Sequence, residues 1–233
     1  MNYSLLRQLS TPLLLLSFVS SNVYAAAPLS TVIVVGFVGG FVRHDDAAHE
    51  EVQLAARLRK DHPSGVEVKI FANHLARQAH QEILRSLDAD HDGTLSAQEK
   101  LDARIVLYGH SWGASEVVTM ARALQKDGLP VLLTIQVDSV SKPGEQDGLI
   151  PANVAQAINF YQLDGLFHGR RQIVAADPSR TEILGNIQLN YKNKPVNISG
   201  YPWYARMFMK PHIEIESDPG VWSRVESLIR SKL

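Results

Sequence analysis

The sequence predicts an α/β fold in which a mostly parallel sheet is flanked by helices. Short β-branched and apolar runs alternate along the chain with segments of helical periodicity. Glycine, proline and asparagine residues separate many of these segments. The 233 residues, 45% of them apolar, are enough for one domain with a sizeable core. We therefore expect residues 26–233 to form a single compact domain.

Strands are predicted where apolar or alternating runs end at turn residues. The clearest runs cover residues 31–38, 66–72, 104–108 and 130–137. Two weaker candidates are residues 172–176 and residues 186–191, the latter either a strand or an extended loop. Catalytic groups in such a sheet are expected where the strands end, at its carboxyl edge.

Helices are predicted where apolar residues recur on one face. These segments are residues 46–61, residues 73–87 with Asn73 as a cap, the stretch from Gly113 to residue 126, and a last helix opened by Pro219. Strands and helices thus alternate over the first half of the chain, as in a parallel sheet with helical crossovers.

A candidate nucleophile follows the third strand. Residues 109–113 read GHSWG, which matches G-x-S-x-G with a strand before it and a helix after it. In that context the serine, Ser111, is expected on a sharp turn with its hydroxyl exposed at the sheet edge. The pattern predicts nucleophilic catalysis by Ser111.

A serine hydroxyl needs a base, and the base needs an orienting carboxylate. Two histidines follow Ser111, and we favour His212, shortly before the last predicted helix, over His168. Asp138 and Asp177 each end a predicted strand. We choose Asp138 because its strand is clearer, and Asp177 remains the alternative acid.

Two backbone N–H groups are candidates for binding the oxyanion. One belongs to Trp112, the residue after the predicted nucleophile. The other is expected in the glycine-rich loop GFVGG at residues 36–40, where we choose Phe37.

Together, the glycine-rich loop, the GHSWG motif, the acid and the late histidine resemble the α/β-hydrolase superfamily, on its lipase and esterase side. The resemblance covers residues 31–233 and implies acyl transfer from a small-molecule or lipid ester to the serine, followed by hydrolysis. The chain has Val35 where the lipase HGGG loop has histidine. Its modest length implies an open site without a large lid.

A second motif lies just before the nucleophile strand. Residues 88–99 read DADHDGTLSAQE and match the pattern D-x-D-x-D-G-x5-E in full, so they resemble an EF-hand loop. Calcium prefers a flexible cage of oxygen ligands. The expected ligands are Asp88, Asp90, Asp92, the Thr94 carbonyl, Ser96 and Glu99. We expect calcium as a structural cofactor that steadies this insertion.

The remaining composition concerns location and partners. Residues 1–25 combine Arg7, a short apolar run and small residues, which predicts a signal peptide and a secreted or periplasmic protein. No integral membrane segment is expected in the mature chain. The formal net charge is −1 and there is no basic tract, so nucleic acid is not an expected partner. The chain has no cysteine, which excludes a thiol nucleophile.

Other functions remain open on the sequence alone. A Ser–His–Asp arrangement does not choose among esters, thioesters and peptides, so a thioesterase or serine peptidase is an alternative. A non-catalytic, calcium-dependent binding protein on the same scaffold is another. The aromatic and methionine residues at 201–209 fit either an acyl-binding wall or ordinary core. The sequence does not determine the oligomeric state.

Overall fold

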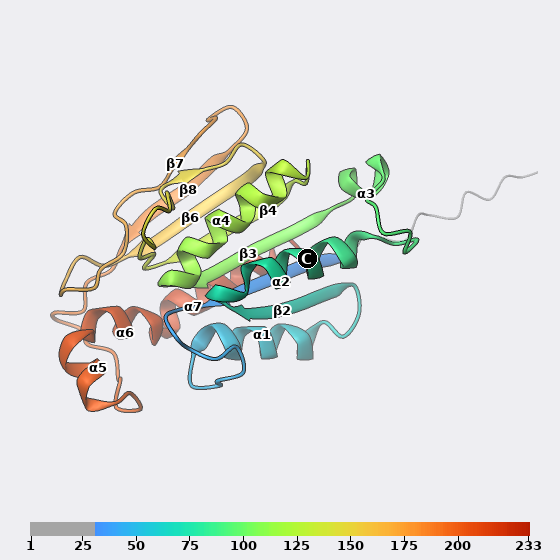
Figure 1. The fold of residues 1–233 in the computed structure, drawn as a ribbon. Helices are drawn as coiled ribbons and strands as arrows, with labels where there is room; N and C mark the ends of the chain where they lie inside the picture. Colours follow the sequence, from blue (N-terminus) through green and yellow to red (C-terminus); the bar gives the residue numbers. More distant parts are fainter. Residues whose placement is uncertain (1–30) are drawn as a thin grey trace, which may run out of the picture.

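The computed structural model describes residues 31–233, and a six-stranded sheet forms its centre (Figure 1). Its order is β2-β1-β3-β4-β6-β8, and every neighbouring pair is parallel. The strands are β1 (Val32–Val38), β2 (Val66–Ala72), β3 (Arg104–His110), β4 (Val131–Val137), β6 (Val154–Tyr161) and β8 (Glu182–Gln188). The predicted parallel α/β architecture is confirmed.

Helices cover both faces of this sheet because alternate strand residues point to opposite sides. Val32 and Val34 pack in one cluster with α1 (Glu50–Asp61) and α7 (Pro219–Arg230). Ile33 and Val35 pack in a second cluster with two other helices, α2 (Ala76–Leu87) and α4 (Trp112–Lys126). The shorter helices are η1 (Asn73–Leu75), α3 (Ala97–Leu101), α5 (Trp203–Phe208) and α6 (Lys210–Glu216).

The strands after β4 differ from the prediction. Strand β6 lies between β4 and β8 in the sheet but was not predicted, because the polar residues Gln156 and Asn159 interrupt its apolar pattern. Within the predicted strand at 172–176, only β7 (Val174–Ala175) forms, and it pairs with β5 (Leu149–Ile150) in a separate small sheet. The last strand, β8, begins four residues before the predicted segment 186–191.

Asn73 does not cap the helix that follows it. The helix α2 begins later, with Leu75 in the cap position and no side-chain cap hydrogen bond. The buried Asn73 amide instead donates to the carbonyl oxygens of Val38 (3.2 Å) and Gly40 (2.5 Å). A tertiary contact with the loop after β1 thus replaces the local cap.

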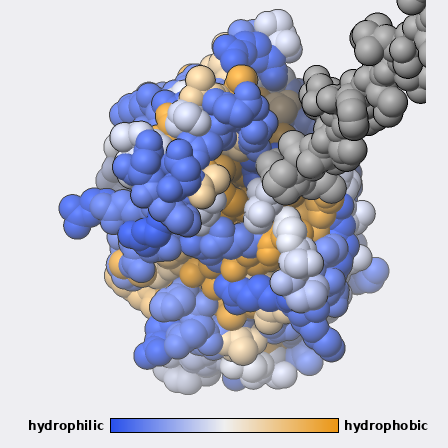
Figure 2. Space-filling view, turned by 90° about the vertical axis from the view of Figure 1, so that its right-hand side faces the viewer, coloured by the Kyte–Doolittle hydropathy of each residue, from blue (hydrophilic) through white to orange (hydrophobic). Residues whose placement is uncertain are grey.

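The carboxyl ends of β1, β3 and β4 meet at one edge of the sheet, and the short helices α5 and α6 lie near this edge (Figure 1). The face at the other end of the strands is mostly hydrophilic, with smaller apolar areas between the charged residues (Figure 2). Among the described residues, no helix has the length and apolar character needed to cross a membrane. The predicted signal peptide, residues 1–25, lies outside the described residues.

Candidate active site

Ser111 occupies the sharp turn between β3 and α4. Its backbone has φ 57° and ψ −125°, a conformation that non-glycine residues rarely adopt. Hydrogen bonds hold the turn: the Ser111 amide donates to the Val137 carbonyl (3.0 Å), and the Ser111 carbonyl accepts from Ala114 (3.1 Å) and Ser115 (3.2 Å). The turn leaves the Ser111 side chain on the wall of a cavity at the sheet edge.

The two glycines of the GHSWG motif are required by close backbone contacts. A Cβ on Gly113 would lie 2.1 Å from the Phe37 carbonyl oxygen, and one on Gly109 would lie 2.6 Å from the Gly113 backbone. Both distances are far below van der Waals contact. These glycines therefore let the end of β1, the end of β3 and the start of α4 pack together around Ser111.

His212 contacts both Ser111 and Asp138. It lies in α6, not in a loop, and is 2% exposed. Its Nε2 is 2.9 Å from Ser111 Oγ, and its Nδ1 is 2.6 Å from Asp138 Oδ2. The structure thus brings three of the predicted residues into one hydrogen-bonded line. The other candidate histidine, His168, is exposed and lies 3.3 Å from the neighbouring Gly169 carbonyl oxygen.

Asp138 follows β4 and is completely buried, with a φ of 44°. Besides His212, its carboxylate accepts hydrogen bonds from the Gln162 amide (3.0 Å), Gln162 Nε2 (2.8 Å) and the Gly169 amide (2.7 Å). These donors satisfy the oxygens of the buried carboxylate and fix its orientation. Gln162 and Gly169 were not predicted, because both lie in the loop after the unrecognised strand β6.

The alternative acid, Asp177, lies in a turn after β7. Its Oδ1 accepts hydrogen bonds from the Ser179 amide (3.0 Å) and Ser179 Oγ (2.6 Å). These bonds lower the pKa of Asp177 below its ordinary value. Asp177 therefore acts as an Asx-type turn residue, and the structure places Asp138, not Asp177, against His212.

The two predicted oxyanion donors have different positions. Trp112 is the first residue of α4, where backbone N–H groups have no intrahelical acceptor. Phe37, by contrast, is fully buried inside β1, between Phe71 and Gly109 of the neighbouring strands. The strand continues to Val38, so Phe37 lies in β1 and not in the loop after it, and its role as a donor stays a prediction.

The first residues of the loop after β1, Gly39, Gly40 and Phe41, line the cavity, as do Val42 and Arg43 further along this loop. A Cβ on Gly39 would lie 2.9 Å from the Ser111 Cβ, so only glycine allows this backbone to pass so close to the serine. The glycine-rich loop is thus beside Ser111, as expected, but through residues further along the chain than Phe37.

The cavity beside Ser111 has a volume of about 680 Å³. Apolar side chains form much of its wall, among them Phe41, Val42, Tyr204, Met209 and Ile213. Several large apolar residues near it are strongly exposed: Phe41, Trp203, Tyr204, Met207 and Phe208. Trp203, Tyr204, Met207 and Phe208 therefore do not form core, which was one of the two predicted roles of the aromatic and methionine residues here.

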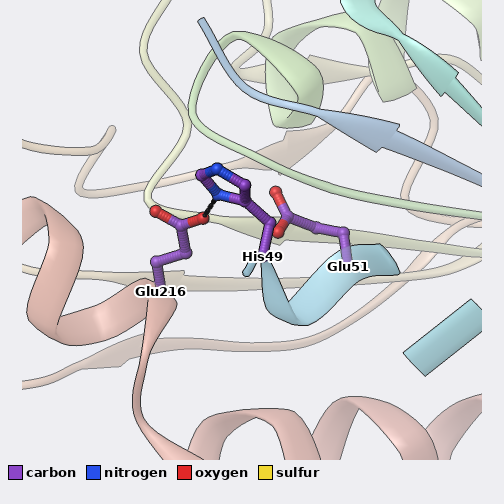
Figure 3. Close-up of side chains that lie close together, drawn as sticks. All are labelled: His49, Glu51 and Glu216. Atoms are coloured by element: carbon purple, nitrogen blue, oxygen red, sulfur yellow. Dashed lines mark hydrogen bonds and ion pairs between the residues drawn. The ribbon is translucent and has the colours of Figure 1, made fainter. Parts of the chain in front are cut away.

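A cluster of four titratable side chains, three of them buried, lies beside the same cavity and was not predicted. It consists of His49, Glu51, His110 and Glu216, and Figure 3 shows three of them, with both carboxylates close to the His49 ring. His49 Nδ1 contacts Glu216, and His110 Nδ1 lies 3.7 Å from each carboxylate. The His110 and His212 rings are 4.6 Å apart. Only His110 belonged to a recognised motif.

Burial and mutual repulsion perturb this cluster. Burial, and then the charge of Glu216, raise the pKa of Glu51 to about 8. Burial lowers the pKa of His110 to about 4. Burial also opposes ionisation of Glu216, but His110 and His49 outweigh it and the pKa of Glu216 falls. In this cluster, Glu216 therefore ionises more readily than Glu51, and ionisation of both carboxylates together is disfavoured.

In the acidic loop, the structure brings together Asp88, Asp90 and Glu99, whose oxygens lie within 4.8 Å of one another. Gly93 turns the loop with a φ of 85°. The Glu99 carboxylate accepts hydrogen bonds from Ala89 and Ser96, which lower its pKa. Asp92 accepts from the Thr94 amide. The oxygen-rich donor set fits a hard cation such as calcium.

Comparisons with known proteins give only distant similarities. No protein-family model matches the chain, and no curated protein matches it. Among solved structures, it is similar to a thioesterase of the prodiginine biosynthetic pathway of Streptomyces coelicolor, with 11% identity, 89% of this chain and 96% of that chain covered, and a TM-score of 0.43. A cutinase-like protein from Cryptococcus sp. gives 12% identity, coverage of 89% and 98%, and a TM-score of 0.45. Human thioesterase 2 is 11% identical, with 87% of this chain and 95% of that chain covered and a TM-score of 0.40.

Proposed function

We propose that the protein is a serine hydrolase that cleaves carboxylic or lipid esters. One observation carries this proposal: His212 links the Ser111 hydroxyl to the buried Asp138 carboxylate, through contacts of 2.9 Å and 2.6 Å. A histidine held between a hydroxyl and a carboxylate is the arrangement that activates a serine nucleophile. Ser111 and His212 both line a cavity large enough for a small-molecule substrate.

In the proposed reaction, Ser111 Oγ attacks the ester carbonyl carbon while His212 Nε2 accepts the hydroxyl proton. Asp138 stabilises the resulting imidazolium through Nδ1–H. The carbon–oxygen bond then breaks, and His212 gives its proton to the leaving alkoxide, which departs as an alcohol. Water attacks the acyl-enzyme by the same route, with His212 as the base, and releases the acid.

The tetrahedral intermediates carry a negative oxygen that needs preorganised donors. The Trp112 amide is one proposed donor, because it is the first in α4 and directly follows Ser111. The second is proposed in the backbone at Gly39, Gly40 or Phe41, which line the cavity beside Ser111.

The wall of the cavity favours an apolar acyl group in the substrate. Phe41, Tyr204 and Met209 line it, and burial of their apolar surface would contribute to binding. A thioester or peptide would use the same nucleophile, so matched ester, thioester and peptide substrates decide between these bonds.

Covalent labelling tests the proposal directly. We expect a fluorophosphonate probe to form a single adduct on Ser111, located by peptide mass spectrometry. Ser111→Ala should abolish labelling, and His212→Ala should slow it by at least about 10³-fold because the base is lost. The matched control is His168→Ala, which should label normally.

Two results would overturn the proposal: no adduct on the folded wild-type protein, or labelling that does not depend on His212. Either result would favour the non-catalytic binding protein. Labelled protein that turns over no ester, but does turn over a thioester or peptide, would retain the nucleophile and change the substrate.

The acidic loop is proposed to bind one calcium ion with a structural role. The side chains of Asp88, Asp90, Asp92 and Glu99, the Thr94 carbonyl and Ser96 would hold it. The loop connects α2 to α3, which is followed by β3 and Ser111. The ion would therefore stabilise the connection that leads into the nucleophile strand.

We also propose export of the protein, which detection of a cleaved N-terminus in the secreted or periplasmic fraction would test.

A further inference from the structure

The cluster of His49, Glu51, His110 and Glu216 contains a carboxylate without a hydrogen-bond donor. Glu51 is completely buried, and among residues 31–233 neither of its carboxylate oxygens has a partner. A buried carboxylate in this state is costly, because water no longer solvates it and nothing in the protein replaces water. Glu51 lies in the first turn of α1, and its side chain points toward His49 and Glu216 (Figure 3).

The surroundings of the two carboxylates concentrate negative charge. Glu216 is 4% exposed and faces the same point as Glu51. Within the described part of the chain, the ion-pair partners of these two side chains are the histidines His49 and His110, with no lysine or arginine. Burial disfavours two adjacent carboxylates that are both ionised, so a proton or a metal ion must balance part of their charge.

We propose that His49, Glu51 and Glu216 bind one divalent transition-metal ion of the zinc class, with His110 as a fourth ligand. Ligand atoms of the first three residues lie within 4.8 Å of one another. His110 Nδ1 is 3.7 Å from both carboxylates, which is too long for hydrogen bonds. Ligands around a tetrahedral zinc ion are separated by about 3.3 Å, given its usual bond lengths. The mixed nitrogen and oxygen donors favour zinc over calcium or magnesium.

A metal ion at this position would join the segments that present Ser111 and His212. His49 directly precedes α1, His110 directly precedes Ser111, and Glu216 ends the helix α6 that carries His212. His49, His110 and Glu216 line the same cavity as Ser111, so an ion can reach them from solvent. The bound ion would fix the positions of the segments that carry Ser111 and His212. Metal binding at this site does not depend on the proposed hydrolysis.

Titration of the untagged, metal-free full chain with zinc chloride tests the site. Excess calcium is present throughout, so that the acidic loop is saturated. Isothermal titration calorimetry should show one zinc ion per chain. Glu51→Gln and Glu216→Gln should each weaken zinc binding at least about tenfold. Loss of a residue that only hydrogen-bonds to a metal ligand typically costs that much, and loss of a ligand itself should cost no less. The matched controls Asp90→Asn and Glu99→Gln, in the acidic loop, should bind zinc as the wild type does.

Thermal unfolding separates loss of the site from loss of the fold. Zinc should raise the Tm of the wild type but not that of Glu51→Gln. Without zinc, Glu51→Gln should melt no lower than the wild type, because glutamine keeps the shape of the side chain and the Glu51 carboxylate oxygens have no hydrogen bond to lose. The wild type loaded with cobalt(II) should show the visible absorption of a tetrahedral site.

Three outcomes would overturn the proposal. One is absence of both zinc binding and the cobalt absorption in folded wild-type protein. Another is zinc affinity that Glu51→Gln and Glu216→Gln leave unchanged. The third is zinc binding that is lost in the acidic-loop variants, which would assign the ion to that loop.

Discussion

At the scale of single residues, the site depends on two side chains in unusual backbone conformations. Ser111 and Asp138 both have positive φ values, 57° and 44°, and each directly follows a strand of the sheet. Such conformations persist only where surrounding contacts fix them. The Val137 carbonyl holds the Ser111 turn, and the Phe160 carbonyl accepts from the Asp138 amide at 2.7 Å. These turns direct both side chains toward His212.

Substitution of each aspartate by asparagine tests which of the two, Asp138 or Asp177, is the acid that orients His212. Asp138→Asn removes the acceptor that fixes the His212 tautomer, so we expect kcat for an ester to fall by about 10⁴-fold. Asp177→Asn removes only a turn contact and should leave kcat within about twofold. Steady-state kinetics of both variants check this. A large loss in Asp177→Asn with an active Asp138→Asn would reverse the assignment.

Gly113 provides a stability prediction at the same scale. The added Cβ of Gly113→Ala would lie 2.1 Å from the Phe37 carbonyl oxygen, so β1 and α4 must separate. We expect a loss of about 1–3 kcal/mol in the free energy of unfolding, as in other overpacked sites. Gly200→Ala, whose Cβ would meet nothing within 4 Å, is the control and should be close to neutral. Urea unfolding of both variants measures the difference, and equal midpoints would contradict the steric argument.

At the scale of elements, loops and short helices complete what the strands begin. The loop after β6 supplies Gln162 and Gly169, which donate three hydrogen bonds to Asp138. Helix α6 carries His212, and α7 fixes its end, because Trp222 Nε1 donates to the Glu216 carbonyl at 2.5 Å. The positions of the acid and the base are therefore set by segments that follow β4 in the chain.

The acidic loop provides a prediction for the connection between α2 and α3. Calcium should raise the Tm of the wild type, because the proposed ligands bind it only when the loop is folded. Glu99→Gln, which removes the expected bidentate ligand, should abolish the rise. Asp102→Asn, an acidic neighbour outside the motif, is the matched control. Differential scanning calorimetry with calcium and with a chelator gives the answer. An unchanged wild-type Tm would exclude a structural calcium ion.

At the scale of the whole molecule, large apolar side chains are exposed near the cavity beside Ser111. Phe41, 92% exposed, contacts Trp112 edge to face, and α5 adds Trp203, Tyr204, Met207 and Phe208. At the far end of the sheet, α3 exposes Leu101 (Figure 1). Exposed apolar groups gathered beside a cavity are typical of sites that bind apolar ligands.

This distribution predicts a dependence on acyl chain length. Phe41→Ser should lower kcat/KM for long-chain esters by about tenfold, since burial of such a side chain is worth about 1.5–3 kcal/mol. Short-chain esters, which do not reach Phe41, should be affected much less. Leu101→Ser is the exposed apolar control and should change neither. An equal effect of Phe41→Ser on all chain lengths would rule out a role in acyl binding.

Local sequence signals determined the parallel fold and the positions of the candidate groups. The first four strands, the turn at Ser111 and the last helix could be predicted because periodicity, glycine placement and Pro219 act over a few neighbouring residues. The same holds for the acidic loop, whose calcium ligands remain a prediction.

Only the tertiary structure decided which distant groups meet. It placed Asp138 against His212, put Gly39, Gly40 and Phe41 in the wall of the cavity beside Ser111, and brought together the cluster of His49, Glu51, His110 and Glu216. Strand β6 was likewise identified only from the tertiary structure. Its polar residues are accommodated by hydrogen bonds across the sheet, such as the one that Asn159 Nδ2 donates to Asn186 Oδ1 at 3.2 Å. Contacts between residues far apart in the chain depend on how helices and strands pack, which no local pattern encodes.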